Sequence, residues 1–252
     1  MINTEQKQTR LNKFISETGF CSRREADKLI ECGRVLLNGI IPEMGTKVFE
    51  GDLVSIDGKP LKAKKEPIYI AFNKPVGITC TTEQNIKGNI IDFIRHQERI
   101  FPIGRLDKAS EGLIFLTSDG DIVNKILRAG NNHEKEYVVT VDKYIHRDFI
   151  RKMSKGVPIL DTVTQKCKVI QENKQLFRII LTQGLNRQIR RMCEVLGYHV
   201  LKLKRVRIMN VNLDGFNSGK WRYLTSDEIE NIKRMVSNSV KTEEASVLSS
   251  SD

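Results

Sequence analysis

One carboxylate lies in a polar segment between two apolar runs of the chain. Asp107 follows Gly104 and Arg105, and residues 101–103 and 113–117 are predicted strands bounded by glycine. Such a segment would hold a charged group rigidly at the end of a sheet. Asp107 is a candidate nucleophile, general base or metal ligand, and a salt bridge with Arg105 is the simplest alternative.

A second segment, residues 186–207, concentrates positive charge. It contains one acid, Glu194, and seven cations: Arg187, Arg190, Arg191, Lys202, Lys204, Arg205 and Arg207. This pattern is typical of a nucleic-acid contact, because lysine and arginine neutralise backbone phosphates. The RNA-binding candidates chosen from it are Arg191, Lys204 and Arg205. Residues 187–196 have apolar side chains at helical spacing and are predicted to form a helix that ends at Gly197.

These motifs together resemble a known enzyme family. Gly104-Arg105-Leu106-Asp107 with Glu111-Gly112-Leu113, and the stretch Asn186 to Met192, are similar to the RsuA/RluB/RluE/RluF branch of the pseudouridine synthases. Residues 131–137 and 207–211 are similar to its RluF type in particular. The resemblance extends from about residue 10 to about residue 225.

The resemblance implies that Asp107 is the nucleophile in the isomerisation of uridine to pseudouridine. Uracil is detached from ribose, turned, and rejoined through its carbon 5. A carboxylate suits this reaction because it can attack the ribose anomeric carbon or uracil carbon 6 and later leave. Both points of attack remain open. The uridine of folded RNA must be flipped out of its stack to reach Asp107.

The resemblance also assigns roles to other side chains. Arg190 is expected to pair with Asp107, and Tyr137 is expected to stack on the target base, although a core tyrosine is the alternative. Leu203 is implied to close the base pocket. We expect Arg187 to contact phosphate, and Arg105 to serve either the loop structure or a backbone phosphate. As a strand neighbour, Arg105 could also be turned away from the substrate.

Residues 10–66 resemble an S4-like RNA-binding domain. Ser22 and Glu25 form a predicted capping box before its second helix, and Asn38-Gly39 favours a hairpin turn. The implied RNA contacts are Arg10, Lys13, Arg23, Arg24 and Lys28. A solvated charged face is the alternative, because residues 1–66 hold twelve basic and ten acidic side chains.

The order of the elements predicts an α+β protein. Residues 67–236 are predicted to form the catalytic domain, on a mixed, mostly antiparallel sheet with flanking helices, because strands follow one another with few helices between them. Residues 62–67 are a predicted linker. Residues 237–252 are acidic and serine-rich, and they are predicted to be a disordered tail.

Composition limits the partners. The net charge of +11 favours a polyanion, with nucleic acid first and an anionic membrane surface second. The sequence contains no apolar run of membrane-spanning length and no signal-peptide core, so we expect a cytoplasmic protein. Five cysteines without a Cys-x-x-Cys pair, and four unpaired histidines, predict neither metal nor cofactor. A monomer is expected.

The sequence thus predicts an RNA pseudouridine synthase that acts on large-subunit (23S) ribosomal RNA. The same chemistry on transfer RNA or small-subunit ribosomal RNA is one alternative. The other is an RNA-binding ribosome-assembly factor in which Asp107 is structural.

Overall fold

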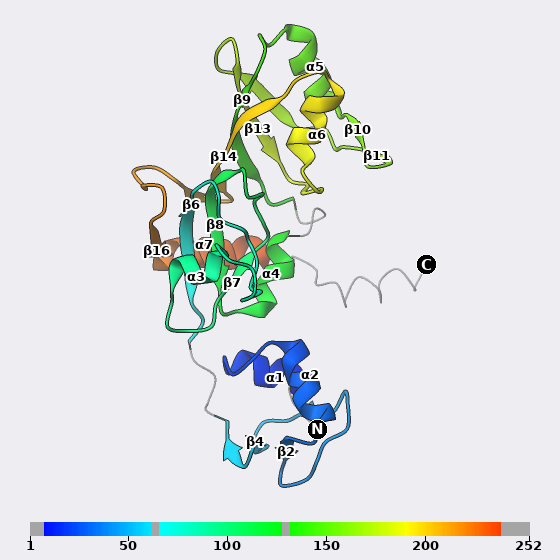
Figure 1. The fold of residues 1–252 in the computed structure, drawn as a ribbon, viewed down its shortest axis with the longest axis vertical. Helices are drawn as coiled ribbons and strands as arrows, with labels where there is room; N and C mark the ends of the chain where they lie inside the picture. Colours follow the sequence, from blue (N-terminus) through cyan, green and yellow to red (C-terminus); the bar gives the residue numbers. More distant parts are fainter. Residues whose placement is uncertain (1–7, 62–65, 128–131, 238–252) are drawn as a thin grey trace, which may run out of the picture. The chain divides into compact units, whose positions relative to one another are not determined.

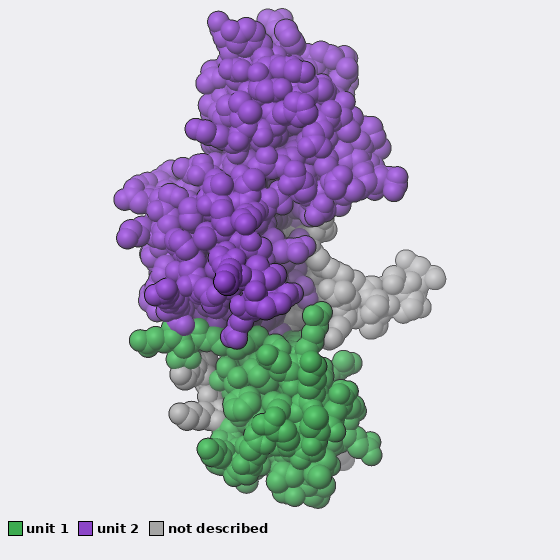
Figure 2. All heavy atoms as spheres, viewed as in Figure 1, with its two compact units in different colours: residues 1–67, 97–99 green, residues 68–96, 100–252 purple. Residues whose placement is uncertain are grey.

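The computed structural model describes residues 8–61, 66–127 and 132–237 (Figure 1). The chain divides into two compact units, one of residues 1–67 with 97–99 and one of residues 68–96 with 100–252 (Figure 2). Most of the expected tail, residues 238–252, lies outside the described residues. None of the helices in the described ranges is both long and apolar enough to cross a bilayer.

The first unit packs two helices against short strands. Its elements are β1 (Thr9–Arg10), α1 (Leu11–Glu17), α2 (Arg23–Glu31), β2 (Val35–Leu37), β3 (Lys47–Val48), β4 (Val54–Ile56) and β5 (Lys59–Pro60). The predicted capping box of α2 is confirmed, since Ser22 Oγ accepts from Glu25 N and Glu25 Oε2 accepts from Ser22 N. Apolar residues of both helices, including Leu11, Ile15 and Ile30, are buried against β2, β3 and β4.

The turn at Asn38-Gly39 does not connect two paired strands, although its sequence favours a hairpin. Leu37 and Ile40 on either side of it form only an isolated bridge, and β2 pairs with β4 instead. The strand partner therefore comes from farther along the chain.

The second unit is built on a nine-stranded sheet. Its elements are β6 (Tyr69–Lys74), α3 (Ile90–Ile94), β7 (Phe101–Ile103), β8 (Glu111–Thr117), α4 (Gly120–Leu127), β9 (Lys135–Val141), α5 (Arg147–Lys155), β10 (Pro158–Ile159), β11 (Thr162–Val163), β12 (Lys168–Gln171), β13 (Leu176–Leu181), α6 (Gln188–Val195), β14 (Val200–Ile208), β15 (Val211–Asn212), β16 (Trp221–Tyr223) and α7 (Ser226–Val236). The strand order is β12-β13-β9-β14-β8-β6-β16, with β15 on β14 and β7 on β8. Among the strand pairs that the described residues form in this sheet, only β14 with β8 is parallel, so the predicted mixed, mostly antiparallel sheet is confirmed.

The central strand β14 is not expected from the sequence. It has nine residues, and basic side chains occupy several of its positions, which weakens the apolar signal of a strand. It lies between β9 and β8 and so joins the two halves of the sheet (Figure 1).

Each part of the sheet buries its own core. The half with β9 and β13 packs against α5 and α6 through residues such as Val139, Phe177 and Met192. In the other half, α4 and α7 cover one face through Ile126 and Ile232, and α3 contributes Ile90 and other residues to a separate cluster.

Candidate active site

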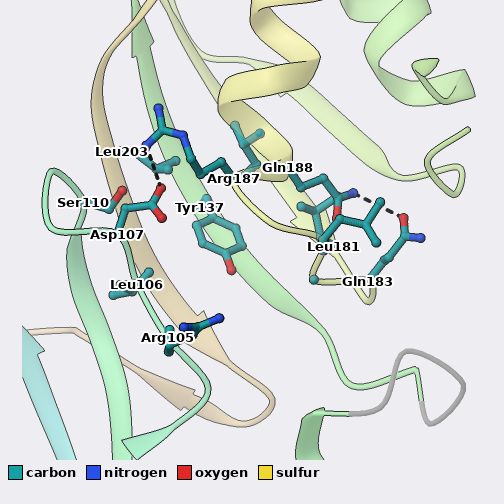
Figure 3. A pocket seen from close by; sticks show the side chains of 13 residues that line it. Arg105, Leu106, Asp107, Ser110, Tyr137, Leu181, Gln183, Arg187, Gln188 and Leu203 are labelled. Atoms are coloured by element: carbon teal, nitrogen blue, oxygen red, sulfur yellow. Dashed lines mark hydrogen bonds and ion pairs between the residues drawn. The ribbon is translucent and has the colours of Figure 1, made fainter. Parts of the chain in front are cut away.

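A cavity of about 490 Å³ opens beside β9 and β14. Its lining includes the loop after β7, with Asp107, and the segment before α6, with Arg187; Tyr137 and Arg205 line it from the sheet. A smaller hollow of about 90 Å³ shares Asp107, Tyr137 and Arg187 and adds Leu203 (Figure 3). Two loops thus meet above the centre of the sheet.

Asp107 is held at the edge of this cavity by a tight loop. Ser110 N donates to Asp107 O at 3.0 Å, and Gly77 N donates to Lys108 O at 2.8 Å. The carboxylate Oδ2 is 3.6 Å from Arg187 Nη1. It is equally far, 3.6 Å, from Arg190 Nε.

Two of the alternatives for Asp107 find no support in this geometry. Its ion pairs are with Arg187 and Arg190, so the simple salt bridge with Arg105 is not formed. Within the described ranges, no group of three histidine, cysteine, aspartate or glutamate side chains could hold a metal ion.

Arg190 is fixed more firmly than Arg187. Its guanidinium donates to Val200 O at 3.2 Å, Ala109 O at 3.1 Å and Ser110 Oγ at 3.1 Å. Burial lowers the pKa of Arg190, and the nearby carboxylate of Asp107 opposes that shift. The side chain of Arg190 is 9% exposed, whereas that of Arg187 is 44% exposed.

Tyr137 lies in the middle of the cavity wall. On β9 it is paired with Arg205 of β14 on one side and with Ile179 of β13 on the other. Arg205 Nη1 donates to the Tyr137 hydroxyl at 3.4 Å, and its guanidinium lies 5.8 Å from the ring centroid. Figure 3 shows the Tyr137 ring near both Asp107 and Arg105.

Leu203 and Arg105 also belong to this site. Leu203 is buried, lines the smaller hollow and lies behind Asp107 (Figure 3). Arg105 lines both hollows and is exposed. It is not turned away from the cavity, because β7 ends at Ile103 and strand alternation no longer applies.

The basic run of β14 is divided between the two faces of the sheet. Leu203 and Arg205 point to the cavity face, while Lys202 and Lys204 point to the opposite one, since strand side chains alternate. Arg205, predicted to contact RNA, is not at the outer surface: the residue is only 4% exposed, its Nε donates to Leu113 O, and it lines the cavity.

The other basic candidates have different surroundings. Arg191 donates to Asn186 from the first turn of α6. Arg207 is bound to Glu134 and Glu136, so the concentration of positive charge in this segment is partly neutralised by acids far away in sequence.

In the first unit, the predicted RNA contacts are mainly at the surface. The exposed ones are Arg10, Arg23, Arg24 and Lys28. Lys13 is partly exposed and forms an ion pair with Glu17 at 3.5 Å. Three of the five cations belong to α2, namely Arg23, Arg24 and Lys28.

One lysine of the cavity, Lys135, was not among the site residues predicted from the sequence. Lys135 is 7% exposed, lines the larger hollow and donates from Nζ to His133 O at 3.1 Å. Burial, with a smaller effect from the charge of Arg205, lowers the pKa of Lys135 to about 8. Lys135 is two residues from Tyr137 on β9, and this spacing is the signal that would have placed both on one face of a strand.

Comparison with known proteins identifies the family of the chain. Residues 68–195 match the family model described as RNA pseudouridylate synthase, and residues 9–54 match the S4 domain. The chain is 60% identical to the dual-specificity RNA pseudouridine synthase RluF of Escherichia coli K12, over 91% of this chain and 80% of that protein. It is 34% identical to the ribosomal large subunit pseudouridine synthase B of Bacillus subtilis, over 90% of this chain and 96% of that protein.

A solved pseudouridylate synthase has the same fold. Its crystal structure superposes with a TM-score of 0.66 at 27% identity, covering 88% of this chain and 99% of that one. The two family models thus match a part of each unit. The chain belongs to the RNA pseudouridylate synthase family and carries an S4 domain in front of its catalytic domain.

Proposed function

We propose that Asp107 is the nucleophile with which this pseudouridine synthase acts on uridine. The observation that carries the proposal is the position of its carboxylate, 3.6 Å from each of two guanidinium groups at the edge of a cavity of about 490 Å³. A carboxylate that is held by charge and faces a cavity has the placement that covalent catalysis requires.

The two arginines have different parts in this scheme. Arg190 has three oxygen acceptors besides the carboxylate, so it positions Asp107 throughout the reaction. Arg187 has a more exposed side chain and can leave Asp107 to bind a phosphate of the incoming RNA. Tyr137 offers the target base a ring to stack on, and Leu203 closes the pocket behind Asp107.

Flipping the uridine out of folded RNA costs a few kcal/mol. Phosphate contacts from Arg105, Lys108 and Arg187, which line the cavity, would offset that cost. The exposed cations of α2 would add further contacts. No redox step or added energy source is needed, because product and substrate are isomers.

We further propose that the substrate is large-subunit ribosomal RNA. The Bacillus subtilis relative is a large-subunit enzyme by name, and the Escherichia coli relative is named as dual-specificity. A second RNA class, with transfer RNA as the candidate, belongs to the same proposal. We expect the protein to act as a monomer in the cytoplasm, where these RNAs are found.

Tritium release from RNA labelled at uridine carbon 5 tests the proposal. The wild-type protein and Asp107→Asn are compared on separate large-subunit, small-subunit and transfer RNAs, with Asp161→Asn, at an exposed position, as the matched control. We expect release from large-subunit RNA by the wild type and the control and none by Asp107→Asn, with RNA affinity retained. Tritium release by Asp107→Asn equal to that of the wild type would show that Asp107 is not the nucleophile. Release from small-subunit RNA alone would contradict the proposed large-subunit substrate.

A further inference from the structure

Two buried cations of the cavity have no acidic partner among the residues that the structure describes. Lys135 is 7% exposed and Arg205 is 4% exposed, and both line the larger hollow. Among the described residues, no carboxylate lies within ion-pair distance of either side chain. Arg205 Nη2 is buried and has no acceptor in the described part of the chain. Since buried charges are ordinarily paired, a substrate group is the natural partner.

Lys135 and Asp107 lie toward different ends of the cavity, and Arg205 lies beside Tyr137, its cross-strand partner. Lys135 is the first residue of β9. Arg190, which faces Asp107, donates to Val200 O, and Val200 pairs with the last residue of β9. Tyr137 follows Lys135 on the same face of the strand, between these two ends. A base stacked on Tyr137 with its sugar at Asp107 would direct its far edge toward Lys135.

The exposure of the cations indicates which part of the RNA reaches them. Arg105, Lys108 and Arg187 are exposed, and phosphates at the surface can reach them. Lys135 and Arg205 are buried in the wall, where only the group that enters deepest can contact them. In a flipped nucleotide that group is the base, and uracil has two carbonyl oxygens that accept hydrogen bonds.

We propose that Lys135 and Arg205 bind the carbonyl oxygens of the flipped uracil and stabilise the negative charge that develops on them. The proposal rests on the proposed function and deepens it. It gives the cavity a carboxylate end for the nucleophile and a cationic end for the base.

Negative charge reaches these oxygens by either route of attack. If Asp107 attacks the ribose anomeric carbon, the bond from that carbon to uracil N1 breaks and its electron pair spreads over N1, O2 and O4. If Asp107 attacks uracil carbon 6, the pair of the C5–C6 double bond moves to give an enolate at O4. A cationic donor at the carbonyl edge therefore lowers the barrier in both cases.

The ionisation of Lys135 agrees with this role. Burial lowers its pKa to about 8, so the ammonium still carries its proton at neutral pH and can donate it in a hydrogen bond. The charged group that acts on Lys135 is the guanidinium of Arg205, on β14. An anionic oxygen bound between them would relieve their repulsion.

The first test is the single-turnover rate with saturating large-subunit RNA. Lys135→Met is expected to lower the rate by about 10²-fold and to leave RNA affinity and its salt dependence unchanged. Lys135→Gln, a polar and uncharged variant, guards against a folding defect and should also be slow. Lys168→Met, at an exposed lysine of the same sheet, is the matched control and should keep the wild-type rate. A wild-type rate in Lys135→Met and Lys135→Gln would overturn the proposal.

The second test changes the oxygen itself. RNA with 4-thiouridine or 2-thiouridine at the target replaces one carbonyl oxygen by sulfur, a weaker acceptor. If Lys135 contacts that oxygen, the substitution slows the wild type and has much less effect on Lys135→Met, because coupled changes are not additive. Additive effects at both oxygens would overturn the proposal. The proposal would also be overturned if Lys135→Met kept the wild-type rate and reduced the log-log salt slope of RNA binding by about one. That result would identify Lys135 as a phosphate contact.

The same assay separates this inference from the proposed function. If the wild type releases tritium and Asp107→Asn does not, the function stands whatever Lys135→Met does. If Asp107→Asn is active, the proposed function fails independently of the thiouridine result.

Discussion

Arg190 shows how a single side chain can hold a carboxylate in place. Its guanidinium contacts the backbone oxygens of Ala109 and Val200 and the Ser110 hydroxyl, and its Nε is directed to Asp107 at 3.6 Å. The planar fork of arginine makes these contacts at once, whereas a lysine ammonium cannot span them.

We therefore predict different outcomes for two conservative substitutions. Arg190→Lys should lower the single-turnover rate by about 10²-fold and the free energy of unfolding by about 1–3 kcal/mol, because buried acceptors lose their donor. Arg187→Lys should mainly weaken RNA binding, since this side chain is more exposed. Rate and affinity measurements on both variants check this; equal effects on the two quantities would contradict the division of roles.

Lys135 gives the stability of the protein a defined pH dependence. Its pKa is about 8 in the folded protein, against an ordinary value of 10.5. Between these values the unfolded chain binds more protons, so the contribution of this group to the free energy of unfolding rises with pH. Below pH 8 Lys135 is charged in the folded protein, and the burial of that charge lowers the free energy of unfolding by its full amount.

Lys135→Met removes this cost together with the group. At pH 7 we expect its free energy of unfolding to exceed that of the wild type. The difference should shrink by on the order of 2–3 kcal/mol between pH 8 and pH 10.5. Urea unfolding of both proteins across this range measures it. A difference that does not change with pH would show that the Lys135 charge costs the folded protein nothing.

At the scale of elements, the junction of β8 and β14 depends on one glycine. Gly112 has a φ of +108°, and a Cβ at this position would lie 2.2 Å from Arg205 O. This is the parallel pair that joins the two halves of the sheet, and it brings the loop with Asp107 next to the strand with Arg205. A side chain there would push the two strands apart.

Gly112→Ala should accordingly destabilise the protein by about 3 kcal/mol or more. The matched control is Gly77→Ala, where φ is +94° but nothing lies within 4 Å of the added Cβ. That variant carries the backbone strain alone and should lose only about 1–2 kcal/mol. Thermal or urea unfolding compares them; equal losses would mean that the contact with Arg205 is not a constraint.

At the scale of the whole molecule, both units carry cations suited to RNA. The first unit presents Arg23, Arg24 and Lys28 on α2, and the second presents Arg105 and Arg187 at the cavity. We predict that the first set adds affinity for RNA and takes no part in the reaction of the base. Its loss should thus change how tightly RNA is held and not how fast a bound uridine reacts.

Replacing the three α2 cations by glutamine should reduce the log-log salt slope of RNA binding by about 2–3. The single-turnover rate at saturating RNA should be unchanged. The control replaces three cations of α5, Arg147, Lys152 and Lys155, and should retain the wild-type slope. A wild-type slope in the α2 variant would favour the solvated-face alternative for the S4 unit.

The sequence by itself determined the local features of this protein. The capping boxes at Ser22–Glu25 and Thr225–Glu228 are formed, because both partners lie within one helical turn. The segment with Asp107 is a loop beside two strands, as its glycines and apolar runs indicate. Family motifs identified Asp107, Tyr137 and Arg190 as candidates; in the fold Asp107 and Tyr137 line the same cavity, and Arg190 pairs with Asp107.

Only the tertiary structure decided the environment of each charge. Lys204 and Arg205 are neighbours in sequence, yet Lys204 is half-buried on one face of the sheet and Arg205 is buried on the other, at the cavity. Arg207 is neutralised by Glu134 and Glu136, which come from more than seventy residues earlier. The physical reason is that a strand takes its surroundings from cross-strand partners, and these are set by sheet order and register rather than by local sequence.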